Sequence, residues 1–163
     1  VGAMQALAVM AGHKVTHVKT HGAMGNMTND DDDMAMAVGR AIKAVDPTLV
    51  YVVMPGLSTE RAAEKLSLPM AREVFADRTY DDSGNLTSRK VEGAVIHDAA
   101  LAAERVLRMV EDQQVVTVTG KKLNVKIDTI CVHGDNPAAV AMARTVRETL
   151  EAAGIAIRPF KAG

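Results

Sequence analysis

The stretch LVYVVMPG at residues 49–56 decides the fold class, because an unbroken apolar run that ends at Pro-Gly is typical of a strand covered on both faces. A helix is expected directly after it, from about Ser58 to Leu66, and another strand from Arg72 to Ala76. Buried strands that alternate with helices indicate βα units around a parallel sheet. We therefore predict an α/β protein.

The same alternation extends in both directions from this stretch. Upstream, a strand is expected at Val15–Lys19 and a helix up to about Val45, with the carboxylates of residues 30–33 in its first turn, where they suit the positive end of the helix dipole. These four aspartates are also compatible with a metal cluster. Downstream, the pattern predicts a helix at Ala99–Asp112, a hairpin of Gln114–Thr119 with Leu123–Ile127, a strand at Ile127–Val132, a helix capped by Asn136 and closed by Gly154, and a last strand at Ile155–Arg158.

Helical spacing also predicts which side chains of the two downstream helices face the core. One face of the first helix carries apolar residues three or four positions apart, and so does one face of the second. The expected core residues are Ala103, Val106, Leu107 and Val110 in the first helix and Val140, Ala143, Val146 and Leu150 in the second.

Composition limits the classes of function. The chain has 163 residues and a formal net charge of -1, and it lacks a basic run, which argues against nucleic-acid binding and against attachment to an acidic membrane. Cys131 is the one cysteine, so an intrachain disulfide is excluded, a reducing cytoplasm fits, and a core thiol is favoured over a nucleophile. The apolar opening is too short to span a bilayer. Val1 falls within a helical pattern without a cap, and we interpret it as a truncated start.

Polar side chains follow two of the predicted strands. HVKTHGA at residues 17–23 places Lys19 and His21 after the first, and ICVHGD at residues 130–135 places His133 and Asp135 after the later one. Ligands of α/β proteins bind at the carboxyl ends of strands, so the two groups suggest one active-site rim. The alternatives are surface polar groups at Lys19 and His21 and a helix cap at Asp135.

A third polar segment, residues 77–90, follows the strand that ends at Ala76. It contains Asp77, Arg78, Tyr80 and Arg89, and long polar insertions after strands are often functional. Arginine suits a carboxylate or phosphate, and aspartate can orient a proton donor. The alternative is an internal Asp-Arg pair that pins the loop. Asp98 is interpreted as a helix cap rather than a catalyst.

Several motifs are absent from the sequence. It has no Gly-rich phosphate loop, and therefore no ATP site of that kind, and it has no HExxH or CxxC metal motif. A metal site would need ligands from separate strand ends, so sequence spacing does not decide whether a metal is bound.

The motifs together resemble the LamB/YcsF family, whose members are described as the A-subunit of 5-oxoprolinase. The resemblance rests on HVKTHGA at 17–23, EVFADRTY at 73–80, DSGNL at 82–86, GAVIHD at 93–98 and DTICVHGD at 128–135, in family order. It implies an irregular β/α barrel of the glycoside hydrolase and deacetylase type. It also implies that residues 1–163 form a single, amino-terminally incomplete barrel domain, the carboxyl-terminal two thirds of the family domain. Gly25 stands where the family usually carries Tyr.

The function that the resemblance implies is that of a cytoplasmic bacterial protein that cleaves 5-oxo-L-proline to L-glutamate with ATP and the B and C partner subunits of 5-oxoprolinase. The sequence leaves open whether a divalent metal is bound and whether the chain forms a homo-oligomer, and the isolated chain is expected to be inactive. The alternatives are a metal-dependent deacetylase-like amidohydrolase and a truncated remnant that only binds partners. The expected catalytic residues are His21, Asp77, His133 and Asp135, and the expected substrate-binding residues are Lys19, Arg78, Tyr80 and Arg89.

Overall fold

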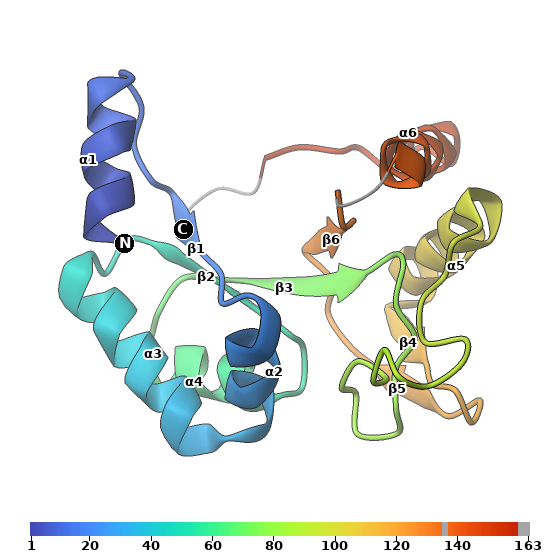
Figure 1. Cartoon of the computed structure of the whole chain (residues 1–163), viewed down its shortest axis with the longest axis horizontal. Coiled ribbons are helices and arrows are strands. Elements are labelled where there is room, and N and C mark those ends of the chain that lie inside the picture. Colours follow the sequence, from blue (N-terminus) through green and yellow to red (C-terminus); the bar gives the residue numbers. More distant parts are fainter. Residues whose placement is uncertain (135–136, 160–163) are drawn as a thin grey trace. The chain divides into compact units, whose positions relative to one another are not determined.

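The structure is a computed structural model, and it describes residues 1–134 and 137–159 (Figure 1). The described chain divides into two compact units, with the boundary between Arg72 and Glu73. Both units combine helices with parallel strand pairs, so the predicted α/β fold class is confirmed.

The first unit contains parallel strands and four helices. Strand β1 pairs with β2, and β2 pairs with the first half of β3, Met70 to Arg72. The elements of this unit are α1 (Gly2–Met10), β1 (His17–Val18), α2 (Gly22–Asp30), α3 (Asp32–Val45), β2 (Val50–Val53), α4 (Ser58–Leu66) and β3 (Met70–Phe75).

Strand β2 forms the centre of the first core. All its residues are buried, and Tyr51 and Val53 pack with Ile42 of α3 and Ala63 of α4. The apolar run at residues 49–56 predicts a strand covered on both faces, and β2 within this run is buried along its whole length. The expected helix start at the aspartates is confirmed for residues 31–33, since Asp31 caps α3 by accepting a hydrogen bond from the backbone N–H of Met34 at 2.9 Å and Asp32 and Asp33 lie in the first turn. Asp30 instead ends α2.

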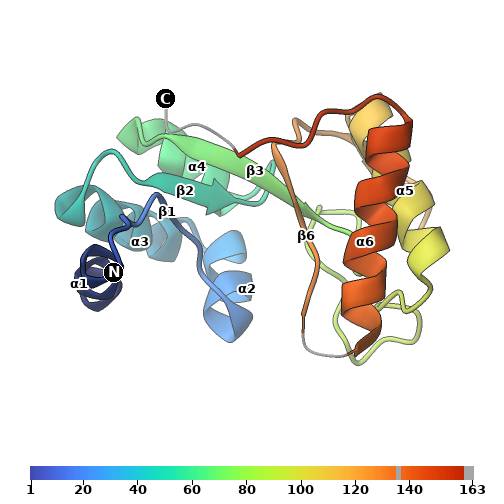
Figure 2. The same cartoon turned by 90° about the horizontal axis from the view of Figure 1, so that it is seen from above.

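The second unit begins with the last half of β3 and contains two long helices. Strand β3 pairs in parallel with β6, while β4 and β5 form the expected antiparallel hairpin. Helices α5 and α6 lie side by side (Figure 2), and their apolar faces share one core. The remaining elements are α5 (Ala99–Asp112), β4 (Gln114–Val116), β5 (Lys122–Asn124), β6 (Thr129–Cys131) and α6 (Pro137–Ala152).

The buried face of α6 differs from the prediction. Val146 and Leu150 are buried as expected, but Val140 is 67% exposed, and Met142 is buried instead. At 3.6 residues per turn, position 140 is rotated by about 120° from position 146, whereas position 142 is rotated by only about 40°. The predicted face was therefore wrong at Val140. Ala143 is also exposed, although its position is rotated by only about 20° from that of Leu150, and the rotation does not explain this exposure.

Two further predictions were wrong. Residues 155–158 do not form a strand. The backbone N–H of Ile155 donates to the carbonyl of Leu150 at 3.0 Å, so it belongs to the carboxyl-terminal end of α6 and not to a strand pair. Helix α2 was not predicted at all, since Gly22, Gly25 and two asparagines give its sequence a low helix propensity.

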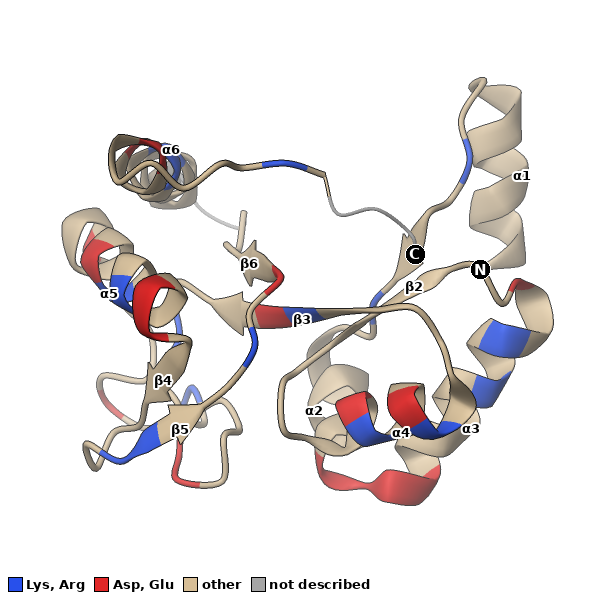
Figure 3. Ribbon diagram, turned by 180° about the vertical axis from the view of Figure 1, so that it is seen from behind, with Lys and Arg blue, Asp and Glu red and all other residues tan. Residues whose placement is uncertain are grey.

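Helix α1 is uncharged (Figure 3) and has no buried residue. Its large apolar side chains are exposed in the described structure. In the described residues, none of the helices is both long and apolar enough to cross a membrane.

Replacing Leu150 by Ala tests the corrected face of α6. Leu150 is 3% exposed within the core of α5 and α6, so the substitution should lower the free energy of unfolding by about 2 to 5 kcal/mol. Val140→Ala, on the exposed side, should change it by less than about 0.5 kcal/mol. Urea unfolding of the two variants measures both values, and equal losses would show that the predicted face was right.

The buried phenol of Tyr51 predicts a loss of stability at high pH. Burial raises the pKa of Tyr51 to about 12, above the value near 10.0 of an exposed tyrosine. The unfolded chain therefore releases this proton at a lower pH than the folded chain, and folding stability should fall as the pH rises from about 10 towards 12. Urea unfolding at several alkaline pH values should show a shallower fall for Tyr51→Phe, and parallel curves for both proteins would contradict the argument.

Candidate active site

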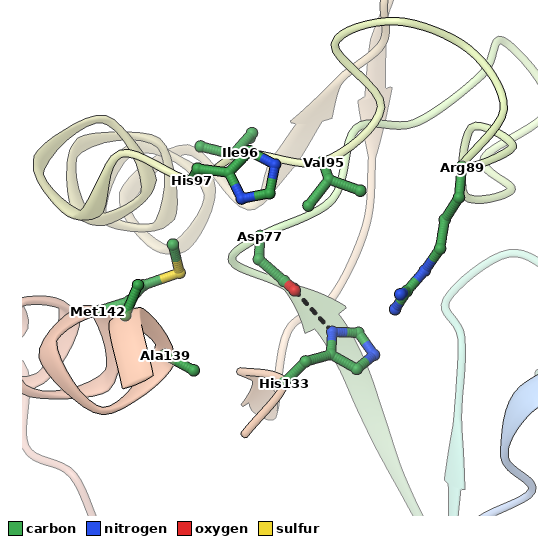
Figure 4. A pocket seen from close by; sticks show the side chains of 9 residues that line it. Asp77, Arg89, Val95, Ile96, His97, His133, Ala139 and Met142 are labelled. Carbon is green, nitrogen blue, oxygen red and sulfur yellow. Dashed lines mark hydrogen bonds and ion pairs between the residues drawn. The ribbon is translucent and has the colours of Figure 1, made fainter. Parts of the chain in front are cut away.

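The parallel pairing of β3 with β6 brings Asp77 and His133 together. Phe75 lies opposite Cys131 in the ladder, and the N–H of Ala76 donates to the carbonyl of Cys131 at 3.0 Å. Asp77 lies two residues after Phe75, and His133 lies two residues after Cys131. Side chains two apart on an extended segment point the same way, so both side chains lie on one face of the strand pair. His133 Nδ1 lies 2.7 Å from Asp77 Oδ2 (Figure 4).

This contact fixes the orientation of the imidazole. An ionised carboxylate only accepts hydrogen bonds, so Nδ1–H of His133 donates to Asp77 and leaves Nε2 without a proton in the neutral ring. The ring of Phe75 stacks on the imidazole with centroids 5.7 Å apart. The Asp77 side chain is 11% exposed and that of His133 is 30% exposed. His133 is therefore held in place, yet a ligand can reach it.

Asp77 and His133 line a pocket of about 260 Å³ within the second unit. Arg89 and His97 complete its polar lining, and Met142 of α6 belongs to its apolar wall (Figure 4). In the described part of the chain, the Arg89 side chain is exposed and makes no ion pair. The pocket thus combines an oriented imidazole, a carboxylate and a cation.

The second carboxylate oxygen of Asp77, Oδ1, is buried and has no hydrogen-bond partner among residues 1–134 and 137–159. A buried acceptor gains free energy from a donor, so Oδ1 is suited to bind a water or an N–H group of a ligand.

Arg78 and Tyr80 hold the loop that follows β3. Arg78 is buried, and its guanidinium donates to the carbonyls of Thr87 at 2.5 Å and Ala94 at 3.4 Å, while burial lowers its pKa. The Tyr80 hydroxyl accepts the N–H of Phe75 at 2.7 Å, and burial raises its pKa. These contacts favour the interpretation that Arg78 pins the loop, but its hydrogen-bond partners are backbone carbonyls and not the aspartate expected from the sequence. Substrate binding by either residue stays a prediction.

Arg105 of α5 was not predicted as part of the site. Its guanidinium donates to the carbonyls of Ala76 and Arg78, each at 3.4 Å, and these residues flank Asp77. Burial lowers the pKa of Arg105. The signal in the sequence is its spacing, since Arg105 stands three positions after Ala102 and four before Met109, on the buried side of α5.

The other predicted residues lie elsewhere. His21 is the exposed N-cap residue of α2, and Lys19 is half-buried directly after β1, both in the first unit. Strand β1 ends before Lys19, so strand alternation does not decide whether the two side chains share a face. Asp135 lies outside the described residues. Asp98 caps α5 by accepting from the N–H of Leu101 at 2.8 Å, as predicted.

The described residues include no cluster of three or more His, Cys, Asp or Glu side chains that could hold a metal ion. Asp32, one of the aspartates weighed as metal ligands, pairs with Arg61 at 2.8 Å.

Comparison with known proteins gives the family. The sequence model of the LamB/YcsF family matches residues 1–163. The chain belongs to the LamB/YcsF family.

Curated members of the LamB/YcsF family share more than half of the residues of this chain. The 5-oxoprolinase A-subunit 2 of Bradyrhizobium diazoefficiens is 55% identical over 163 residues, which cover 100% of this chain and 64% of that protein. The 5-oxoprolinase A-subunit of Rhodopseudomonas palustris is 56% identical over 160 residues, 98% of this chain and 63% of that protein. The chain therefore spans just under two thirds of the length of these relatives.

A solved member supports the fold. The crystal structure of the lactam utilization protein from Thermus thermophilus matches with a TM-score of 0.89 and 41% identity, over 98% of this chain and 64% of that one. The predicted resemblance to the LamB/YcsF family is thus confirmed. The family match extends over the whole chain, and it does not bear out the expectation that residues 1–163 are a carboxyl-terminal two thirds of the family domain.

The two arginines of the loop should respond differently to truncation. Arg78→Ala leaves the carbonyls of Thr87 and Ala94 without this donor and should lower the free energy of unfolding by about 1 to 3 kcal/mol. Arg89→Ala removes an exposed side chain and should change it by less than about 0.5 kcal/mol. Urea unfolding compares the two variants, and a larger loss for Arg89→Ala would contradict the assignment.

Proposed function

We propose that the protein is one component of an ATP-dependent 5-oxoprolinase that opens the lactam of 5-oxo-L-proline to L-glutamate together with the B and C partner subunits. The names of the curated relatives, at 55% and 56% identity, support this proposal. The match to a protein named for lactam utilization, at 41% identity, points to the same substrate class.

The observation that carries the proposal is the pair of Asp77 and His133 in the pocket. Hydrolysis of an amide requires a base that takes a proton from water as the water oxygen bonds to the carbonyl carbon. Nε2 of His133 is suited to this because Asp77 orients the ring and stabilises the imidazolium that forms. The unpartnered Oδ1 of Asp77 is suited to hold the attacking water or the lactam N–H.

Arg89 supplies the remaining element of recognition. 5-Oxo-L-proline carries a carboxylate next to its ring, and a guanidinium binds a carboxylate with two parallel hydrogen bonds. Arg89 is exposed in the pocket, whereas the guanidinium of Arg78 already donates to carbonyls of the loop. We therefore assign the substrate carboxylate first to Arg89.

The proposal also includes residues of the first unit, Asp135 and ATP, but assigns no single reaction step to them. Lys19 and His21 are proposed as a second binding and proton-transfer group, and Asp135 as a further orienting carboxylate. ATP is proposed as the co-substrate of the complex. The steps proposed here are those that the chain's own side chains can perform.

Replacement of the paired residues tests the proposal in the protein that carries this chain, assembled with its partner subunits. Wild-type complex should form L-glutamate from 5-oxo-L-proline and ATP. His133→Gln and Asp77→Asn should each lower kcat by about a hundredfold or more, because the base is lost or loses its orientation. Glutamate is measured directly by chromatography.

His13→Gln is the matched control, since His13 is an exposed histidine of the first unit. It should keep the wild-type rate. Absence of glutamate formation by the wild-type complex would overturn the proposed function, and full activity of His133→Gln would overturn the assigned base.

A further inference from the structure

His97 lines the same pocket as His133 but has no part in the steps above. Its backbone is fixed on both sides. The N–H of Ile96, which is buried, donates to the carbonyl of Asp77 at 2.8 Å, and Asp98 caps α5. The position of His97 beside Asp77 is therefore set by the contacts of its two neighbours in the sequence and does not depend on its own side chain.

The imidazole of His97 is exposed and faces the pocket (Figure 4). Among residues 1–134 and 137–159, its ring makes no hydrogen bond or ion pair. His133, in contrast, is tied to Asp77 through Nδ1. The pocket thus holds one oriented imidazole and one whose ring nitrogens are both available, and Figure 4 draws Asp77 between them.

Opening a lactam requires proton movements at two different atoms. The water oxygen bonds to the carbonyl carbon and releases a proton, and the bond between this carbon and the ring nitrogen then breaks. The nitrogen keeps the electron pair of that bond and must gain a proton to leave as an amine. Water supplies the oxygen of the new carboxylate and the proton that the nitrogen gains, so the ring opens to the single product L-glutamate without another reactant, and the complex couples this step to ATP.

An amine nitrogen expelled without a proton is a very poor leaving group, so a proton donor near it lowers the barrier. A histidine serves near neutral pH, since its ordinary pKa is about 6.5. The titratable and charged groups that line the pocket with His97 are Asp77, Arg89 and His133, and Asp98 adjoins it in the sequence. Of these groups, Asp77 and His133 are hydrogen-bonded to each other, and Arg89 stays charged at any ordinary pH, so neither the pair nor the arginine is free to donate this proton.

We propose that His97 is the general acid that protonates the leaving lactam nitrogen while His133 acts as the base. This inference rests on the proposed function and adds a catalytic residue to it. The supporting observation is that His97 lies in the pocket that Asp77 and His133 share. Its ring makes no hydrogen bond within the described chain.

The test is steady-state and single-turnover kinetics of the assembled complex with His97→Gln. Gln keeps a hydrogen-bonding side chain but cannot transfer a proton. We expect kcat to fall by about a hundredfold, with KM changed by less than about threefold. The decline of wild-type kcat at alkaline pH, where the acid loses its proton, should disappear in the variant.

His97→Ala provides a second readout that a structural role would not produce. Added imidazole should restore part of its activity, because the free base can enter the vacated space and transfer the proton. His13→Gln again serves as the control for loss of an exposed histidine.

The outcomes separate the two proposals. If the wild-type complex forms glutamate and His97→Gln retains its kcat, or changes only KM, the inference is overturned and the proposed function stands. Loss of activity without imidazole rescue and with an unchanged pH profile would also overturn it. If the wild-type complex forms no glutamate, the proposed function itself fails.

Discussion

The parallel register between β3 and β6 is the constraint on which the candidate site depends. Phe75 lies opposite Cys131, so Asp77 and His133 emerge on one face while Ala76, Ile130 and Val132 pack into the core of α5 and α6 on the other. A slip of one residue would turn one of the paired side chains into that core. The core therefore determines the chemistry, because burial of the alternate residues selects the register that joins the carboxylate to the imidazole.

Two arginines, the buried Arg78 of the loop and the half-buried Arg105 of α5, reinforce the same geometry. Arg78 and Arg105 both donate to backbone carbonyls, and burial lowers the pKa of each guanidinium. Arginine tolerates this because it stays charged at any ordinary pH and its donors reach several carbonyls at once. The carbonyls that Arg105 contacts flank Asp77, so the position of the carboxylate depends on a helix far along the chain.

Local signals predicted the elements that depend on local physics. Helices α4 and α5 have the predicted bounds because apolar periodicity marks their extent, and in α5 Asp98 also supplies a cap. The sequence could also nominate Asp77 and His133, since each follows a strand. It could not show that they touch, because strand partner and register depend on residues more than fifty positions apart. Helix α2 escaped prediction for a related reason: Thr28 is fully buried, so tertiary packing outweighs its poor propensity.

Arg78 and Tyr80, which stabilise the loop, and Asp77, which faces the pocket, differ in how completely their side chains are hydrogen-bonded. Tyr80 and Arg78 have partners for their buried polar atoms, whereas Asp77 keeps a buried oxygen without a donor in the described chain. An unsatisfied buried acceptor costs free energy on folding, so packing alone would favour an apolar residue at this position. Retaining a carboxylate there is understandable if a bound ligand or water supplies the missing donor, and the same pocket offers the oriented imidazole that such a ligand would meet. The hydroxyls of Tyr51 and Thr87 are also buried without a partner in the described chain, so the incomplete bonding of Asp77 supports a place of chemistry only together with the oriented imidazole beside it.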